Sequence, residues 1–181
     1  MLFESRPAAL LLTPGASADR DHSTLVAFEE ALPEIHVERL TLATTSVPRA
    51  VGKVVEATQN LAAELDVPLS DIVIGGRSFG GRSCSVAAAE GLAVAGLLLL
   101  SYPLHPPGKP EKLRTDHFGD ISIPTLFISG ERDPFGTPEE FGEHLPAISG
   151  TTSIEWVKGN HSPKGAAEAE VISIARRYLL E

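Results

Sequence analysis

Four short and almost wholly apolar runs most constrain the fold of this chain. They lie at residues 8–13, 71–75, 94–101 and 123–129. A run that is apolar at every position, rather than at alternate positions, is typical of a strand covered on both faces. Segments with helical spacing separate most of these runs. This alternation predicts an α/β fold, with a mostly parallel sheet flanked by helices.

The remaining elements complete the predicted order of strands and helices. Two further strands are predicted at residues 36–42 and 152–158, and the mixed polarity of the first places it near a sheet edge. Apolar residues at helical spacing predict helices at residues 22–32, 47–65 and 165–180. An alanine-rich segment predicts one at 80–90, and the N-cap pattern Thr-Pro-Glu-Glu predicts one at 137–147. A proline-rich connection at 102–120, with one short helix at 111–118, joins two of the strands. It is too short to form a cap domain.

Composition limits the classes of partner. The chain has 181 residues, of which 43% are hydrophobic, so we expect a single domain over residues 1–181. Its net charge of −9 argues against nucleic acid, because phosphate binding needs a basic surface. A single cysteine, Cys84, excludes an internal disulfide, and the six histidines lack metal-ligand spacing. We therefore expect no metal and no cofactor.

Two segments bear on targeting and membrane insertion. Glu4 and Arg6 interrupt the N-terminal segment, and its apolar run is shorter than that of a secretion signal. The longest uncharged stretch, residues 91–108, contains several prolines and is apolar only in its first part. A membrane span needs about 20 apolar residues. We expect a soluble, cytoplasmic protein that does not engage a membrane.

The strongest local signal is the sequence Gly76-Arg77-Ser78-Phe79-Gly80, a G-x-S-x-G pattern. A nucleophilic serine that projects from a sheet needs a very tight strand-to-helix turn, and glycines two positions before and after it avoid steric clashes. Here an apolar run precedes the pattern and a small-residue helical segment follows it. A plain packing turn and a phosphate-binding loop are the alternatives.

Candidate partners for Ser78 follow two later strands. Asp133 lies after the run at 123–129, and His161 lies after the strand predicted at 152–158. Functional groups gather beyond the carboxyl ends of parallel strands, and the order Ser, Asp, His is that of α/β-hydrolases. Asp133 is also compatible with a simple turn, Glu131 is a competing acid in the same loop, and His161 is compatible with a surface position.

Backbone N–H groups are expected to form an oxyanion hole beside Ser78. One belongs to Phe79, the residue after the nucleophile, and the other belongs to Gly15 or Ala16 in the loop after the first strand. Pocket-lining roles are possible for His105 and Tyr102. Two roles are open for Arg77, a structural partner of an acid such as Glu131 or a contact for an acidic substrate.

The chain resembles the α/β-hydrolase superfamily. Residues 75–82 (GGRSFGGR) and 100–105 (LSYPLH) are similar to the small subfamily of testis-expressed protein thirty and of the hydrolase-like domain of non-specific-lethal complex subunit three, which is related to dienelactone hydrolases. The resemblance covers residues 8–180 and implies the fold and the triad positions, but no substrate. The chain departs from relatives at Pro14, where they often have histidine, and at Ser78, where dienelactone hydrolases have cysteine. It also lacks the initial antiparallel strands of larger hydrolases.

These features predict a serine hydrolase of a small ester or thioester, with a small-molecule acyl substrate. Ser78 would be the nucleophile, His161 the base and Asp133 its orienting acid. The main rival is a non-catalytic scaffold of the same fold that binds a protein. A nucleotide-binding flavodoxin-like or Rossmann-like domain is disfavoured, because no G-x-G-x-x-G follows the first run.

Overall fold

The computed structural model describes residues 2–3 and 5–181, and it is built around a six-stranded sheet. All five strand pairings are parallel, in the order β2-β1-β3-β4-β5-β6. The strands are β1 (Ala9–Thr13), β2 (His36–Arg39), β3 (Ile72–Arg77), β4 (Gly96–Leu100), β5 (Thr125–Gly130) and β6 (Thr152–Val157). The predicted α/β class and number of strands are confirmed, and β2 lies at an edge as expected.

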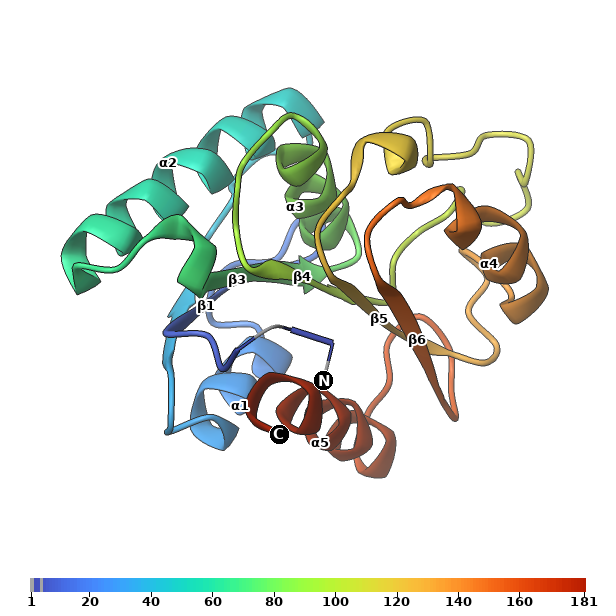
Figure 1. Cartoon of the computed structure of the whole chain (residues 1–181). Coiled ribbons are helices and arrows are strands. Elements are labelled where there is room, and N and C mark those ends of the chain that lie inside the picture. Colours follow the sequence, from blue (N-terminus) through green and yellow to red (C-terminus); the bar gives the residue numbers. More distant parts are fainter. Residues whose placement is uncertain (1, 4) are drawn as a thin grey trace.

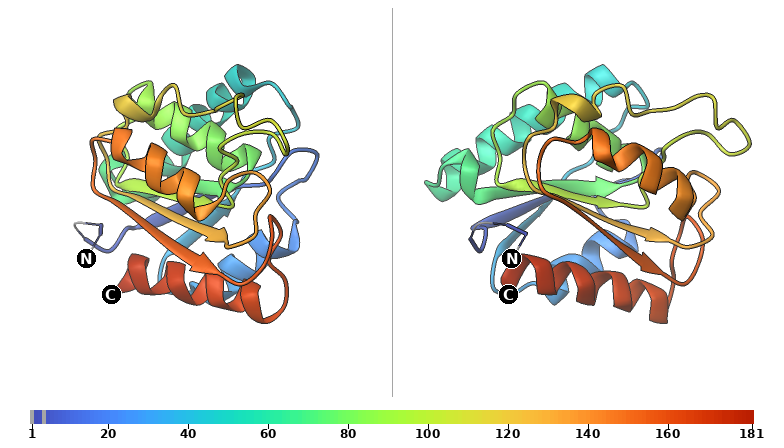
Figure 2. Two further views of the ribbon diagram at one scale, coloured as in Figure 1. Left: turned by 90° about the vertical axis from the view of Figure 1, so that its right-hand side faces the viewer. Right: turned by 45° about the vertical axis from the view of Figure 1, so that its right-hand side comes forward.

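Helices cover both faces of the sheet (Figure 1). They are α1 (Ser23–Ala31), α2 (Val47–Leu65), α3 (Phe79–Ala89), α4 (Pro138–His144) and α5 (Ala166–Leu180). Figure 2 shows α1 and α5 below the sheet, and α2, α3 and α4 above it. None of the helices in the described part of the chain combines the length and apolar character needed to cross a bilayer.

The apolar runs are strands because both of their faces are buried. In β1, Ala9 and Leu11 pack into the core beneath α2 and α3, whereas Leu10 and Leu12 pack into the core against α1 and α5. All four residues are fully buried. Each leucine buried in this way contributes roughly 1.5–3 kcal/mol of hydrophobic stabilisation. The strand is therefore apolar at consecutive positions because helices cover both faces of the sheet.

The strand order creates a switch point between β1 and β3. From β1 the chain proceeds toward the β2 edge, and from β3 it proceeds through α3 to β4 on the other side. Crevices at such a point, beyond the carboxyl ends of the strands, are the usual ligand sites of open α/β sheets. The G-x-S-x-G turn leaves the sheet at this position, directly after β3.

The short helix predicted at residues 111–118 is wrong. The connection between β4 and β5 contains only a 3-10 turn, Phe118–Asp120. The Arg114 N–H donates to the Leu104 carbonyl (2.8 Å), and the Tyr102 hydroxyl donates to the Arg114 carbonyl (2.7 Å). These longer-range bonds take the backbone groups that a helix would have used.

His117 lies in the segment between β4 and β5, and it makes the stability of the fold sensitive to acid. Burial, and then the charge of Arg82, lowers the pKa of His117 to about 4. Below about pH 6.5 the unfolded chain binds a proton that the folded chain rejects, so stability is lost as the pH falls from about 6.5 to 4. Urea unfolding should show that His117→Gln removes about 1–2 kcal/mol of that loss, a value reduced for the partial exposure of the ring. If the free energy of unfolding of the variant fell with pH as steeply as that of wild type, His117 would not be the group responsible.

Candidate active site

Ser78 occupies a strained turn between β3 and α3. Its backbone angles are φ 51° and ψ −114°, which place it in a region that residues other than glycine rarely adopt. Such a conformation costs about 1–3 kcal/mol and persists only where surrounding contacts enforce it. The turn projects Ser78 beyond the carboxyl end of the sheet, as a nucleophile requires.

The flanking glycines allow β1 to approach this turn. A Cβ on Gly76 would lie 2.0 Å from Thr13 Oγ1, and a Cβ on Gly80 would lie 2.4 Å from the Pro14 carbonyl oxygen. Thr13 is fully buried and donates its hydroxyl to the Gly75 carbonyl (3.0 Å). The glycines of the motif are therefore required by contact with the end of β1.

Replacing a motif glycine should destabilise the fold strongly. Gly80→Ala places a methyl group against backbone atoms of β1 that cannot move independently, and we expect a loss of at least about 3 kcal/mol in urea unfolding. Gly52→Ala is the matched control, because Gly52 lies within α2 with open space at its Cβ position. That control should be neutral or stabilising by up to about 1 kcal/mol. If the two changes had equal effects on stability, the close approach of β1 to residue 80 would not be the reason for glycine there.

Three predicted site residues come together beside this turn. His161 Nε2 lies 2.9 Å from Ser78 Oγ, and His161 Nδ1 lies 2.8 Å from Asp133 Oδ2. Because a carboxylate only accepts hydrogen bonds, Nδ1 carries the proton and Nε2 is free to accept from the serine hydroxyl. This arrangement is able to remove the proton of Ser78 during nucleophilic attack.

The loop after β5 separates the two competing acids. Asp133 is 2% exposed, and its Oδ1 accepts the Phe135 N–H (2.9 Å). Glu131 is exposed to solvent, two residues earlier. The Phe135 ring stacks on His161 with ring centroids 4.0 Å apart, which fixes the imidazole plane. The structure thus places Asp133, and not Glu131, against His161.

The expected oxyanion residues also lie at this edge. A Cβ on Gly15 would lie 3.9 Å from Ser78 Cβ, so the loop after β1 passes beside the serine. Ala16 follows in an exposed turn that the Ala18 N–H closes onto the Gly15 carbonyl (3.3 Å). Phe79 is the first residue of α3, and an N–H at that position has no partner within the helix.

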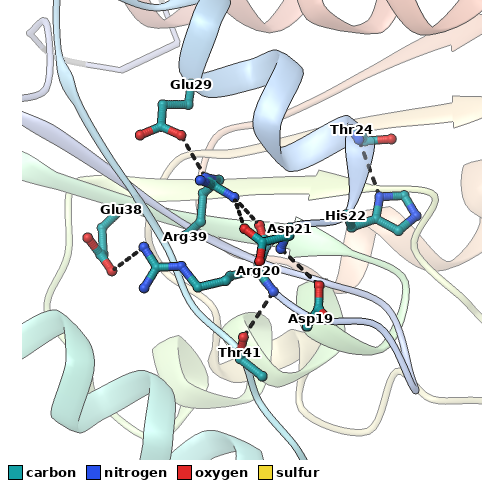
Figure 3. Close-up of polar contacts among 9 residues, drawn as sticks. All are labelled: Asp19, Arg20, Asp21, His22, Thr24, Glu29, Glu38, Arg39 and Thr41. Carbon is teal, nitrogen blue, oxygen red and sulfur yellow. Dashed lines mark hydrogen bonds and ion pairs between the residues drawn. The ribbon is translucent and has the colours of Figure 1, made fainter.

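A polar network holds the continuation of this loop against β2 (Figure 3). Arg39 Nη1 donates to Asp21 Oδ1 (3.0 Å) and to the Arg20 carbonyl, and its Nε donates to Glu29 Oε2 (2.7 Å). The Arg20 N–H donates to Thr41 Oγ1 (2.9 Å). Arg39 therefore ties the β1–α1 loop both to α1 and to the edge strand. No local pattern in the sequence singles out this residue, because its partners are spread over separate segments.

The pocket roles expected for Tyr102 and His105 are wrong. Tyr102 has no exposed surface and packs against Phe118 and Phe127, with ring centroids 5.5 and 5.7 Å away. His105 is 5% exposed and is held by the Pro106 carbonyl (2.8 Å) and by Glu140 Oε1 (3.1 Å). Both side chains anchor the β4–β5 connection to the core instead of facing a ligand.

Arg77 has a different partner from the one suggested. Its Nη2 donates to the His161 carbonyl (2.9 Å) and to Ser162 Oγ, so Glu131 is not its partner. Burial lowers the pKa of Arg77, but the guanidinium stays protonated. Nothing in the local sequence identified this contact, which joins segments that are 84 residues apart.

Two open cavities are lined by neighbours of the hydrogen-bonded residues Ser78, His161 and Asp133, although none of these three lines either cavity. One, of about 500 Å³, lies along the Gly15 loop and is lined mostly by small and hydroxyl-bearing residues, including Ser17, Thr41 and Thr44. The other, of about 450 Å³, is lined by Arg77, Ser162 and residues at the starts of α1 and α5, including Glu168. Among residues 2–3 and 5–181, no three His, Cys, Asp or Glu side chains gather as a metal site would require.

Comparison with known proteins identifies the fold. A family profile described as an alpha/beta hydrolase domain matches residues 6–172. The structure is similar to a dienelactone hydrolase from Anabaena variabilis, with a TM-score of 0.76 and 18% identity over 98% of this chain and 89% of that chain. It is also similar to a thermophilic esterase from Thermogutta terrifontis, with a TM-score of 0.72 and 20% identity over 97% and 90% of the two chains. An N-formylmaleamic acid deformylase from Pseudomonas putida has a TM-score of 0.74 and 13% identity over 96% and 93%. At these identities the likeness shows a shared fold.

Proposed function

We propose that this chain, which belongs to the alpha/beta hydrolase family, is a serine hydrolase that cleaves a small ester or thioester through an acyl-enzyme. The observation that carries the proposal is the continuous chain of hydrogen bonds from Ser78 Oγ through His161 to Asp133. The strained backbone at Ser78 supports it, because strain of this kind gathers at functional sites.

The proposed reaction has two steps. Ser78 Oγ attacks the carbonyl carbon of the substrate while His161 Nε2 takes the hydroxyl proton. His161 then gives this proton to the departing alkoxide or thiolate, which leaves as alcohol or thiol. In the second step His161 deprotonates a water molecule, which attacks the acyl carbon. The bond from that carbon to Ser78 Oγ then breaks, His161 returns the proton to Ser78 Oγ, and the carboxylic acid is released. Asp133 stabilises the imidazolium that forms in each step.

The oxyanion of each tetrahedral intermediate is assigned to backbone donors. The Phe79 N–H is one donor, and the Gly15 or Ala16 N–H is the other. The positive end of the α3 dipole adds to this field, since Phe79 opens the helix. Each such donor is typically worth about 3 kcal/mol of transition-state stabilisation.

We also propose membership of the small subfamily of testis-expressed protein thirty and of non-specific-lethal complex subunit three. The strings at residues 75–82 and 100–105 support this assignment. The rival function, a scaffold that binds a protein without catalysis, comes from the same resemblance. The three hydrogen-bonded side chains favour the enzyme.

Labelling with an active-site-directed fluorophosphonate tests the proposal. We expect one label per chain, mapped to Ser78 by peptide mass spectrometry, and hydrolysis of short activated esters by the unlabelled protein. Heat-unfolded protein is the control for non-specific reaction. Absence of both labelling and hydrolysis by the folded protein would favour the scaffold.

The site should accept substrates without interfacial activation. In the described structure, the connection between β4 and β5 contains no α-helix, and its first residues, from Ser101 to His105, are buried. Its prolines fix φ and remove backbone donors, which keeps the segment stiff. The rate with a longer ester should therefore rise smoothly through the micelle-forming concentration of that ester. A sharp increase at that concentration would reveal a moving lid.

A further inference from the structure

Arg77 lies between the two catalytic segments of the proposed mechanism. It is the last residue of β3 and immediately precedes Ser78. Its Nη2 donates to the backbone carbonyl of His161 itself (2.9 Å) and to the Ser162 hydroxyl. One guanidinium thus connects the strand that carries the nucleophile to the loop that carries the base.

The same guanidinium also contacts the loop expected to form the oxyanion hole. Its Nη1 lies 3.1 Å from the position that a Cβ on Gly15 would occupy. A methyl group at residue 15 would therefore shift the guanidinium by a few tenths of an ångström. Arg77 consequently touches all three segments whose relative placement sets the site: the Gly15 loop, the Ser78 turn and the His161 loop.

The loop that carries His161 needs an anchor of this kind. It has no regular structure, and Gly159 within it adopts φ 137°. Apart from the bonds of the His161 ring to Asp133 and Ser78, its other polar contacts are short-range or backbone in type, such as the Ser162 N–H to Asn160 Oδ1 (3.0 Å) and the Arg132 N–H to the Gly159 carbonyl (2.9 Å). In the described part of the chain, no carboxylate lies within 4.0 Å of the Arg77 guanidinium. Arg77 therefore directs its hydrogen bonds to neutral groups of the loop, and the charges of Asp133 and Glu168 act on it from beyond that distance.

We propose that Arg77 is a positioning residue that holds His161 Nε2 on Ser78 Oγ by clamping the His161 carbonyl and packing over Gly15. This inference rests on the proposed serine-hydrolase function. The planar fork of arginine is essential to it, because an ammonium group offers no fixed pair of donors. A loss of alignment by about 1 Å is enough to cost about 100-fold in rate.

The first experiment compares Arg77→Ala and Arg77→Lys with wild type. Rates are expressed per site that the fluorophosphonate labels at completion, so that unfolded protein is not counted. We expect kcat to fall about 30- to 100-fold in Arg77→Ala and about tenfold in Arg77→Lys, with KM changed less than about threefold. Full activity per site in both variants would overturn the proposal, as would a loss confined to KM.

Guanidinium ion provides the second readout. The cavity of about 450 Å³ opens onto Arg77, so a small cation can reach the space left by Arg77→Ala. Non-denaturing guanidinium should restore kcat in Arg77→Ala at least about fivefold, and tetramethylammonium at equal ionic strength should not. Arg49→Ala, on the exposed surface of α2, is the control and should respond to neither ion. Restoration by both ions would indicate a charge effect and not a positioning one.

The contact with Gly15 gives a third test, which remains informative if Arg77→Ala folds poorly. Gly15→Ala should slow the wild-type enzyme by displacing the guanidinium and should cost less in the Arg77→Lys background, so the two changes are not additive. Additive effects would contradict the clamp. Failure of the proposed function is distinguishable, because wild type would then show neither labelling at Ser78 nor ester hydrolysis.

Discussion

Ser78→Ala is expected to lower kcat/KM for short activated esters by at least about 10⁴-fold, because removing the nucleophile leaves only the oxyanion donors and substrate binding. The substitution keeps the backbone of the turn and deletes one hydroxyl, so the melting temperature should change by less than about 2 °C. Steady-state kinetics and thermal unfolding of the same preparation measure the two effects. More than a few per cent of wild-type activity would remove Ser78 from the nucleophile role.

The strain at Ser78 adds a control for the same experiment. A residue at φ 51° and ψ −114° is better accommodated by glycine than by serine or alanine. Ser78→Gly should therefore be as inactive as Ser78→Ala while having a higher melting temperature. This pairing separates loss of the hydroxyl from damage to the fold, since one inactive variant would be more stable than the active protein.

The sheet was predictable because its strands are buried on both faces. Residues such as Leu10 and Leu11 are apolar at consecutive positions because each packs against a different helical layer. The G-x-S-x-G turn was predictable because its glycines stand at fixed positions around the serine, although the contacts that require them come from the end of β1. In both cases the controlling interaction leaves a pattern within a few adjacent residues.

The features that sequence reasoning missed depend on contacts between segments that are distant in the sequence. The Arg77 contact with His161 spans 84 residues, and no local pattern encodes which loop the guanidinium will reach. Tyr102 was expected in a pocket, yet its hydroxyl is satisfied by the Arg114 carbonyl, which allows complete burial. The short helix predicted at residues 111–118 does not form for the same reason, because that segment bonds to Leu104 and Tyr102.

The identity of the acid that bonds to His161 was only partly predictable, because the sequence offered both Asp133 and Glu131. Both acids lie in one loop, and the structure distinguishes them by burial and by one backbone bond. Oδ1 of Asp133 accepts the Phe135 N–H (2.9 Å) and also lies 3.0 Å from His161 Nδ1, whereas Oδ2 is the nearer oxygen to Nδ1, at 2.8 Å. This asymmetry allows a sharp test of the acid, because it predicts how an amide would sit in the same place.

Asp133→Asn should lower kcat by about 10³- to 10⁴-fold. The oxygen of the introduced amide would keep the Phe135 N–H, so its NH₂ group would face His161 Nδ1. A donor at that position requires Nδ1 to accept, which moves the imidazole proton to Nε2 and prevents Nε2 from accepting from Ser78. The three side chains would keep their positions, but the His161 imidazole would be in the wrong tautomer.

Glu131→Gln is the matched control, because Glu131 is exposed in the same loop and its backbone N–H, bonded to the Val157 carbonyl, is unaffected. Its kcat should stay within about twofold of wild type, since exposed charges of this kind contribute little. Fluorophosphonate labelling should be slowed in Asp133→Asn and normal in Glu131→Gln, because phosphonylation uses the same serine and base. If Glu131→Gln were the more damaging change, His161 would take its orientation from the exposed acid, and the buried Asp133 would be a structural turn residue.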